Sequence, residues 1–344
     1  MITALLLSGV AVAVGLQQPS TAPSPSAPAS APGATAFDLR ISPLVELHFA
    51  LRRAASITGD ASGGAAWASA VEAVRSIERE LGGGLAWGLL ESALAGCESA
   101  AEAKELFPQL PESFSMRDGR KLPLRDMAVR LADALAGAEP GFMSETWPGH
   151  KAKLEEARTR IAAELLPKES ECFAHLLKSL AMSDPGLPIP VYLVAEAPEP
   201  GAFTHRKRGG GGVCFVGLDS ASGTQLYETI LHESIHALDI ATDAQDTVLQ
   251  IMRRKLREAG IGPTDKRFRD VPHTLMFVQA AETVRAVLDP QHKHYGDVYG
   301  YYPKVPEATQ AVRPQWEAHL RGDITREQAI DRIVGEAVKP SGTR

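Results

Sequence analysis

The sequence contains little of what several classes of protein require. Its 344 residues include 3 cysteines, so at most one intrachain disulfide can form and a disulfide-stapled scaffold is excluded. Aromatic residues make up 6% of the chain and the formal net charge is −6, so no nucleic-acid partner is expected. After residue 16 no apolar run is long enough to cross a bilayer, so we expect no membrane span in the mature chain. The remaining composition, 44% hydrophobic and 23% charged, is that of a globular protein with a sizeable core.

The first residues have the pattern of an export signal. Residues 2–16 are apolar and small, and Ala11, Val12 and Ala13 offer a small-x-small cleavage site. No Lys or Arg precedes this run, so an uncleaved membrane anchor is the alternative. Residues 17–36 are rich in Pro, Ser and Ala, which predicts a disordered linker. We therefore predict a signal peptide at 1–16 and an exported protein, periplasmic or extracellular.

The rest of the chain divides by its pattern into two regions. Residues 37–183 read almost entirely as helix, and residues 184–344 begin with strand-like runs at 188–195 and 212–217. The segment between these runs, 205–212, is basic and glycine-rich and is expected to be a hairpin tip. The run at 212–217 precedes the central helix closely enough to form a sheet edge beside it, where an extended peptide could add. The predicted fold class is α+β, mainly α.

Some polar and sulfur-containing residues are expected to be structural. Cys97, Cys172 and Cys214 have no local pattern typical of a catalytic thiolate, so three buried thiols are favoured over a Cys97–Cys172 disulfide. His48 and His175 lie beside apolar residues on helix faces and are expected to be hydrogen-bonded.

The stretch 226–239 contains the pattern H-E-x-x-H, with His232, Glu233 and His236. Its apolar periodicity predicts a helix, on which residues four apart lie on the same face. Two imidazoles at that spacing can bind one tetrahedral metal ion, and the glutamate between them can reach a water on that ion. Asp239 follows one turn later, either as a second partner for an imidazole or as a helix-end aspartate.

A catalytic zinc usually takes three protein ligands, so one ligand remains to be found. Glu282 sits in an otherwise apolar predicted helix, where a buried carboxylate needs a metal or a partner. Its alternative is an exposed charge paired with Arg285 three residues on. Three histidines compete with it for the role of third ligand: His273, His292 and His294.

The motif together with the later glutamate resembles the gluzincin side of the zincin metallopeptidases, over roughly residues 191–288. That resemblance implies a zincin-like core at 184–344 with C-terminal helices, and Glu282 as a ligand beside His232 and His236. The supporting aspartate that the family carries four residues after its glutamate is Ala286 here, so the third ligand stays open. The chain is also similar to an uncharacterised bacterial family with the pattern H-E-x-x-H-x-L-D.

The resemblance implies a zinc-dependent hydrolase of peptide or amide bonds, in which Glu233 activates a zinc-bound water. His273, or a tyrosine of the loop 295–302, would stabilise the developing oxyanion. The expected cofactor is Zn²⁺ and the expected partner is a peptide or protein substrate. Two other functions remain open: a non-enzymatic scaffolding protein with a structural metal, and a metallohydrolase of a non-peptide substrate. The oligomeric state and the cleavage specificity do not follow from the sequence.

Overall fold

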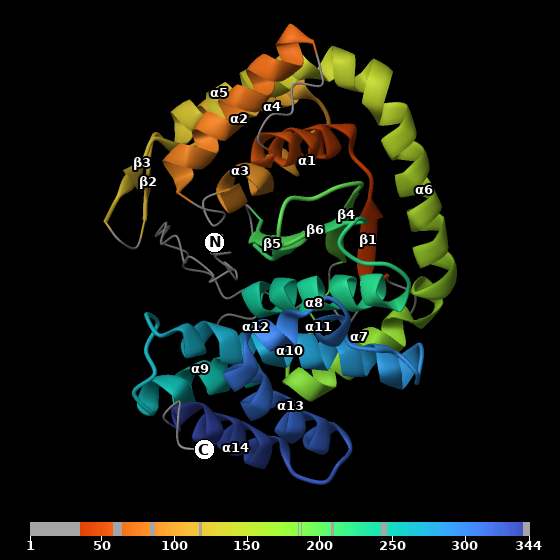
Figure 1. Ribbon diagram of the computed structural model, residues 1–344, viewed down its shortest axis with the longest axis vertical. Coiled ribbons are helices and arrows are strands. Elements are labelled where there is room, and N and C mark those ends of the chain that lie inside the picture. The colour runs from red at the N-terminus through yellow and green to blue at the C-terminus, as the bar shows by residue number, and fades with distance from the viewer. Residues whose placement is uncertain are drawn as a thin grey trace.

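The computed structural model describes residues 35–339, apart from 58–63, 83–86, 117–118, 185, 187, 208–209 and 242–245. The predicted signal peptide and most of the predicted linker therefore lie outside the described residues. In the described part, the chain is a mainly helical α+β protein with a small mixed sheet between two groups of helices (Figure 1). The predicted fold class is confirmed at this level.

The sheet has four strands in the order β1-β4-β6-β5. Strands β1, β4 and β6 run parallel, and β5 runs antiparallel to β6 at one edge. Strands β4 and β6 are buried along their whole length, as is typical of parallel strands covered on both faces. The strand bounds are β1 Phe37–Arg40, β4 Ile189–Val194, β5 Ala202–Arg206 and β6 Gly212–Gly217. A separate hairpin pairs β2 (Phe114–Ser115) with β3 (Lys121–Leu122).

The helices α1 to α5 lie on one side of the sheet (Figure 1) and share a core of their own. Helix α1 connects that core to the sheet because it is apolar on two faces. Leu47 and Leu51 pack into the helical core, whereas Val45 and Phe49 pack on the sheet. The bounds are α1 Pro43–Ser56, α2 Ala65–Leu81, α3 Trp87–Leu94, α4 Ala100–Leu106, the 3-10 turn η2 Phe107–Gln109 and α5 Leu124–Gly141.

The long helix α6 (Trp147–Glu164) runs along the side of the molecule from the first group of helices to the second (Figure 1). The π-helical turn η3 (Phe142–Thr146) precedes it and the 3-10 turn η4 (Leu166–Lys168) follows it. Helix α8 then covers the other face of the sheet, and α10 packs against α8 within the largest core. The bounds are α7 Glu169–Leu180, α8 Thr224–Ala241, α9 Val248–Glu258, α10 Lys266–Val287, α11 Tyr295–Val298, α12 Tyr301–Lys304, α13 Pro306–Leu320 and α14 Arg326–Val338.

The two predicted strands are confirmed as β4 and β6, but the sheet contains two more. Strand β1 comes from the region expected to be helical, and it pairs with β4. Strand β5 includes His205 and Arg206, where the sequence indicated a hairpin tip. The edge strand beside α8 is therefore β5, and the prediction that gave this place to 212–217 was wrong because β6 lies between β4 and β5.

The cysteines agree with the prediction, because Cys97, Cys172 and Cys214 are all free and buried. The two expected structural histidines are also hydrogen-bonded: His48 to Glu91 and His175 to Thr283. Within the described ranges, no helix combines the length and the apolar character that a membrane crossing requires.

Candidate metal centre

Helix α8 carries the first two histidines of the site. Buried Ile230, Leu231 and Ile235 fix one side of this helix in the core. His232 and His236, four residues apart, therefore lie together on one face. Their Nε2 atoms are 3.2 Å apart.

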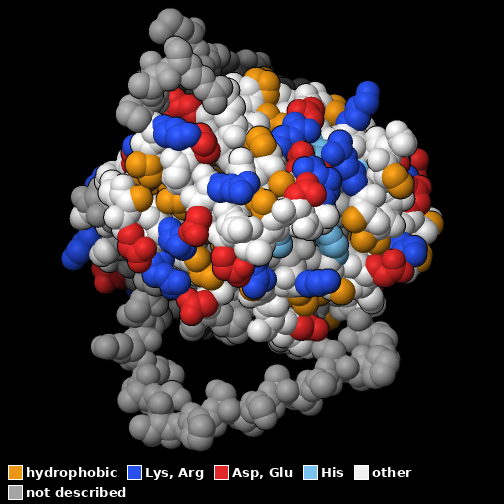
Figure 2. Space-filling view, turned by 90° about the horizontal axis from the view of Figure 1, so that it is seen from below, with side chains coloured by type: hydrophobic (Ala, Val, Ile, Leu, Met, Phe, Trp, Pro, Cys, Tyr) orange, Lys and Arg blue, Asp and Glu red, His pale blue; other side chains and the backbone are white. Residues whose placement is uncertain are grey.

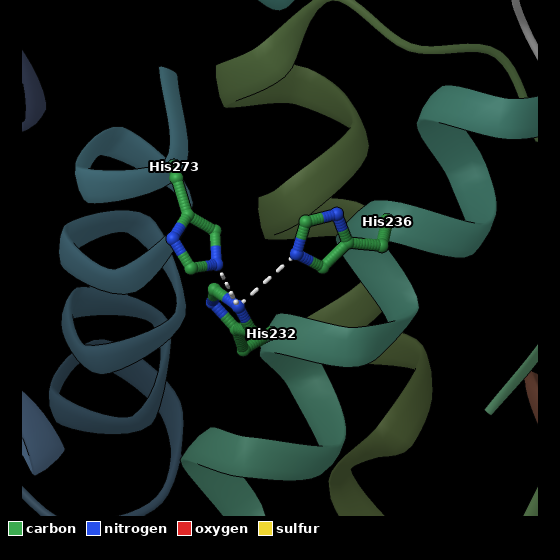
Figure 3. Close-up of side chains that lie close together, drawn as sticks. All are labelled: His232, His236 and His273. Carbon is green, nitrogen blue, oxygen red and sulfur yellow. Dashed lines mark hydrogen bonds between the residues drawn. The ribbon is translucent and has the colours of Figure 1, made fainter. Parts of the chain in front are cut away.

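Helix α10 supplies the third histidine. The Nε2 atom of His273 lies 3.2 Å from that of His232, and the three rings meet between the two helices (Figure 3). Candidate ligand atoms of His232, His236 and His273 all lie within 4.8 Å of one another. Two nitrogens, each bound at about 2.0–2.1 Å to a tetrahedral ion, are about 3.3 Å apart. The three side chains could therefore hold one metal ion, and we refer to them as the three-histidine group.

The surroundings keep these rings uncharged. Burial is the main cause, and it lowers the pKa of His232 and of His273 well below the usual value. The neighbouring rings add to this effect in both cases. Burial, followed by the charge of Arg253, lowers the pKa of His236 to about 4. Neutral imidazole is the form that binds a metal ion, so the group matches the chemistry of its donors.

Aromatic residues fix the orientation of two of the rings. The Nδ1 atom of His273 lies 3.1 Å from the hydroxyl of Tyr301, which leaves Nε2 pointing toward the other histidines. The ring of His232 stacks on Phe277 with a centroid distance of 3.9 Å. Phe277 in turn stacks on Tyr301. Such partners orient metal-binding histidines in proteins generally.

Glu233 lies beside the three-histidine group and is held by the edge strand. The hydroxyl of Thr204 in β5 donates a hydrogen bond to its carboxylate at 2.6 Å. Burial raises the pKa of Glu233 to about 7, and the bond from Thr204 opposes this shift. A carboxyl group with such a pKa can both accept and donate a proton near neutral pH.

A cavity of about 230 Å³ opens onto these residues. It is lined by the three-histidine group, Glu233 and Thr204. Residues from other elements also line it: Arg52 and Glu78 of the N-terminal helices, and Tyr295, Tyr299 and Tyr301 of the segment that contains α11 and α12. On the face drawn in Figure 2, histidine side chains reach the surface between acidic and basic side chains. The candidate ligands are therefore positioned on the wall of a cavity.

The structure brings His273 and not Glu282 to the two histidines of α8. Glu282 follows His273 by nine residues on the same helix, which corresponds to about half a turn of rotation and about 13 Å of rise. Its carboxylate instead accepts hydrogen bonds from His294 at 2.7 Å and from Arg285 at 2.8 Å. The pairing with Arg285, three residues on, is the alternative that the sequence offered.

The other predicted residues are also engaged elsewhere. His292 bonds to Thr224 and to the buried carboxylate of Glu228. Asp239 pairs with the guanidinium of Arg253 at 2.7 Å. Of the residues at the site, sequence reasoning missed Thr204, whose strand was not recognised.

No protein-family model, no curated protein and no solved structure matches this chain. The function must therefore be argued from the site itself. What the geometry defines is a mainly helical α+β protein with a buried three-histidine group that could hold a metal ion.

Proposed function

We propose that this protein is a zinc-dependent hydrolase of peptide or amide bonds, with His232, His236 and His273 as zinc ligands and Glu233 as the catalytic base. One observation carries the proposal: three neutral histidines with ligand atoms within 4.8 Å of one another share a cavity wall with a glutamate held in place by Thr204. Residues 184–344 then form a zincin-like core. Its third ligand differs from the gluzincin arrangement, because a histidine takes the place expected for Glu282.

A bound zinc ion would lower the pKa of a coordinated water and polarise the substrate carbonyl. The residues of the chain would provide the remaining functions. Glu233, whose pKa is raised to about 7, would accept a proton from the attacking water and then donate that proton to the leaving amine. Thr204 would keep the carboxylate aimed into the cavity.

The sequence offered His273 or a tyrosine of residues 295–302 as the oxyanion donor, and in this proposal the role falls to Tyr295. Both ring nitrogens of His273 are committed, one to the ligand group and one to Tyr301. Tyr295 lines the same cavity, and its hydroxyl is close enough to Glu233 for that charge to contribute to its raised pKa. A phenolic O–H that burial keeps protonated is a suitable donor to a developing oxyanion.

The edge strand supports a peptide as the substrate. The amide of Lys207 bonds to the carbonyl of Gly211, and hydrogen-bonded pairs alternate along an antiparallel ladder. The backbone groups of Ala202 and Thr204 therefore point away from β6, and both residues line the cavity. An extended peptide could add to this edge by main-chain hydrogen bonds.

Two further features of the proposal concern the metal's role and the location. A structural zinc is normally closed by four protein ligands. Among the described residues the group contains three, which favours a catalytic ion over the structural metal of a scaffold. We also propose that the enzyme is exported, because residues 1–16 resemble a signal peptide.

The substitution Glu233→Gln tests the function. We expect the purified variant to retain zinc, measured by elemental analysis, and to lose about hundredfold or more of its activity on a peptide library. Glu258→Gln, which changes an exposed glutamate at the end of α9 outside the cavity, serves as the matched control. Full activity of a zinc-loaded Glu233→Gln variant would contradict the assignment of the base. A zinc-free wild-type protein would contradict the metal site.

A further inference from the structure

The cavity has a second wall that the proposed reaction does not use. Along β5, side chains alternate between the two faces of the sheet. Thr204 points toward Glu233 of α8, whereas His205 points toward Glu91 of α3. Because Thr204, His205 and Arg52 of α1 all line the cavity, the cavity extends past the outer edge of β5 to the N-terminal helices.

Arg52 of α1 is held on this second wall. Its Nη1 atom donates to the carboxylate of Glu91, and its guanidinium lies 4.8 Å from the ring of Trp87. Glu91 also binds His48 at 3.0 Å and His205 at 2.6 Å. The guanidinium is therefore fixed by an ion pair and by an aromatic face, and it needs no rearrangement to meet a ligand.

Among the described residues, two buried N–H groups in this region have no hydrogen-bond acceptor. They are Nε–H of Arg52 and Nε1–H of Trp87. Arg52 is 4% exposed. A buried N–H without an acceptor costs about 1–3 kcal/mol, and such groups are rare in folded proteins. Of these two residues Arg52 lines the cavity, so its guanidinium is the donor that a group with acceptor atoms can meet there.

We infer that Arg52, supported by Glu91 and His205, forms a subsite for a carboxylate of the peptide substrate. A guanidinium has five N–H donors in a planar fork that matches a carboxylate, and Glu91 occupies part of it. A peptide extended along β5 presents successive side chains to opposite faces of the sheet. The carboxylate therefore belongs either to an acidic side chain next to the residue that faces the three-histidine group, or to the C-terminus of the peptide.

Other charged residues also line the cavity, and the acidic ones among them would favour a cationic peptide. Arg269 pairs with Asp270, so these two charges cancel locally. Glu78 of α2 and Glu199 also line the cavity, as does Lys304 of α12. If Glu78 dominated the field near Arg52, the site would prefer a cationic peptide, and the test must separate these two outcomes.

The inference rests on the proposed function, and one experiment distinguishes their failures. The zinc-loaded full-length protein is given an N-acetylated peptide library in three matched forms: with a free C-terminus, with a C-terminal amide, and amidated with Asp and Glu replaced by Asn and Gln. We expect the fully neutral form to be cleaved about tenfold to hundredfold less efficiently than a form that carries carboxylates. The first form against the second tests the C-terminal carboxylate, and the second against the third tests acidic side chains.

Each result has a definite meaning. Cleavage of all three forms at equal rates, or preference for peptides rich in Lys and Arg, would overturn the carboxylate subsite and leave the hydrolase intact. Cleavage of none of them would contradict the peptidase proposal, together with the subsite that depends on it.

A variant then connects the selectivity to Arg52. Arg52→Met alone would leave Glu91 without its counter-ion, so the double variant Arg52→Met/Glu91→Gln removes both charges. We expect this variant to keep its zinc and to lose the selectivity between charged and neutral peptides. Arg53→Met, one residue further along α1 and outside the cavity, should leave that selectivity unchanged. Unaltered selectivity in the double variant would show that Arg52 does not bind the carboxylate.

Discussion

Helix α10 contributes to two clusters of potential metal ligands, and they differ in what surrounds them. The three-histidine group contains His273 and contacts aromatic rings and a cavity. The second cluster contains Glu282, His294 and Glu317, whose ligand atoms also lie within 4.8 Å of one another. In the second cluster the carboxylates are already paired, Glu282 with Arg285 and Glu317 with Arg313.

This difference shows why proximity of donor atoms alone does not define a metal site. In the second cluster, guanidinium groups occupy carboxylate lone pairs that an ion would need, and their positive charges oppose a cation. In the three-histidine group, the Nε2 atom of His232 lies next to the Nε2 atoms of the two other imidazoles and not next to a guanidinium. The first arrangement is suited to metal binding, whereas the second consists of ion pairs within α10 and within α13 and of one that links α10 to the loop before α11.

The largest expected effect comes from removing one ligand of the three-histidine group. His273→Ala should lower the affinity for zinc by at least about hundredfold, because loss of a ligand exceeds the cost of losing a supporting partner. Glu282→Gln, on the same helix, should leave zinc affinity unchanged. Both affinities can be measured by competition with a chromophoric chelator.

The opposite result for zinc binding would exchange the roles assigned to His273 and Glu282. Zinc retained in His273→Ala and lost in Glu282→Gln would restore the glutamate as third ligand. It would also require α10 to turn by about half a revolution relative to α8.

How much of the site could be predicted from the sequence depends on whether a residue is positioned by its own helix or by packing between distant segments. The pair His232 and His236 follows from helical periodicity, which is local. The choice between His273 and Glu282 depends on which face of α10 meets α8, and that is decided by packing between distant segments. The sequence did contain one relevant signal, since Arg285 stands where it can pair with Glu282.

The fold shows the same division. Strands β4 and β6 are apolar and buried, so their sequences identify them. Strand β5 is only partly buried and carries His205 and Arg206, so its pattern resembles a loop. It becomes a strand because β6 offers it an antiparallel partner, which no local pattern reveals. Thr204 was missed for this reason.

A smaller effect is expected from the tyrosines that bond to His273 on α10 and to His294 in the loop before α11. Tyr301 bonds to Nδ1 of His273, and Tyr302 bonds to Nδ1 of His294, at 3.1 Å and 3.0 Å. Tyr301→Phe should lower zinc affinity about tenfold, because the imidazole loses the partner that fixes its orientation. Tyr302→Phe removes the same hydroxyl from the other cluster and should not change zinc affinity. Equal effects of the two substitutions would contradict the assignment of separate roles.

The smallest expected effect is on the free energy of unfolding, to which the second cluster contributes. Glu282→Gln should lower the free energy of unfolding by about 1–3 kcal/mol at pH 7, because buried His294 loses a charged partner. Burial by itself raises the pKa of Glu282, but the bonds and charges of His294 and Arg285 outweigh it and leave the pKa below its usual value of 4.5.

A lowered folded-state pKa means that this stabilisation is present above pH 4.5 and is lost as the pH falls through the folded value. Urea unfolding of the wild type and Glu282→Gln should therefore show a gap that narrows as the pH is lowered from 7 toward 3. In the absence of zinc, a gap that stays constant over this range would mean that the carboxylate charge of Glu282 is not what stabilises the second cluster. The same gap measured with zinc added should be unchanged, because in our assignment the ion binds to the other face of α10.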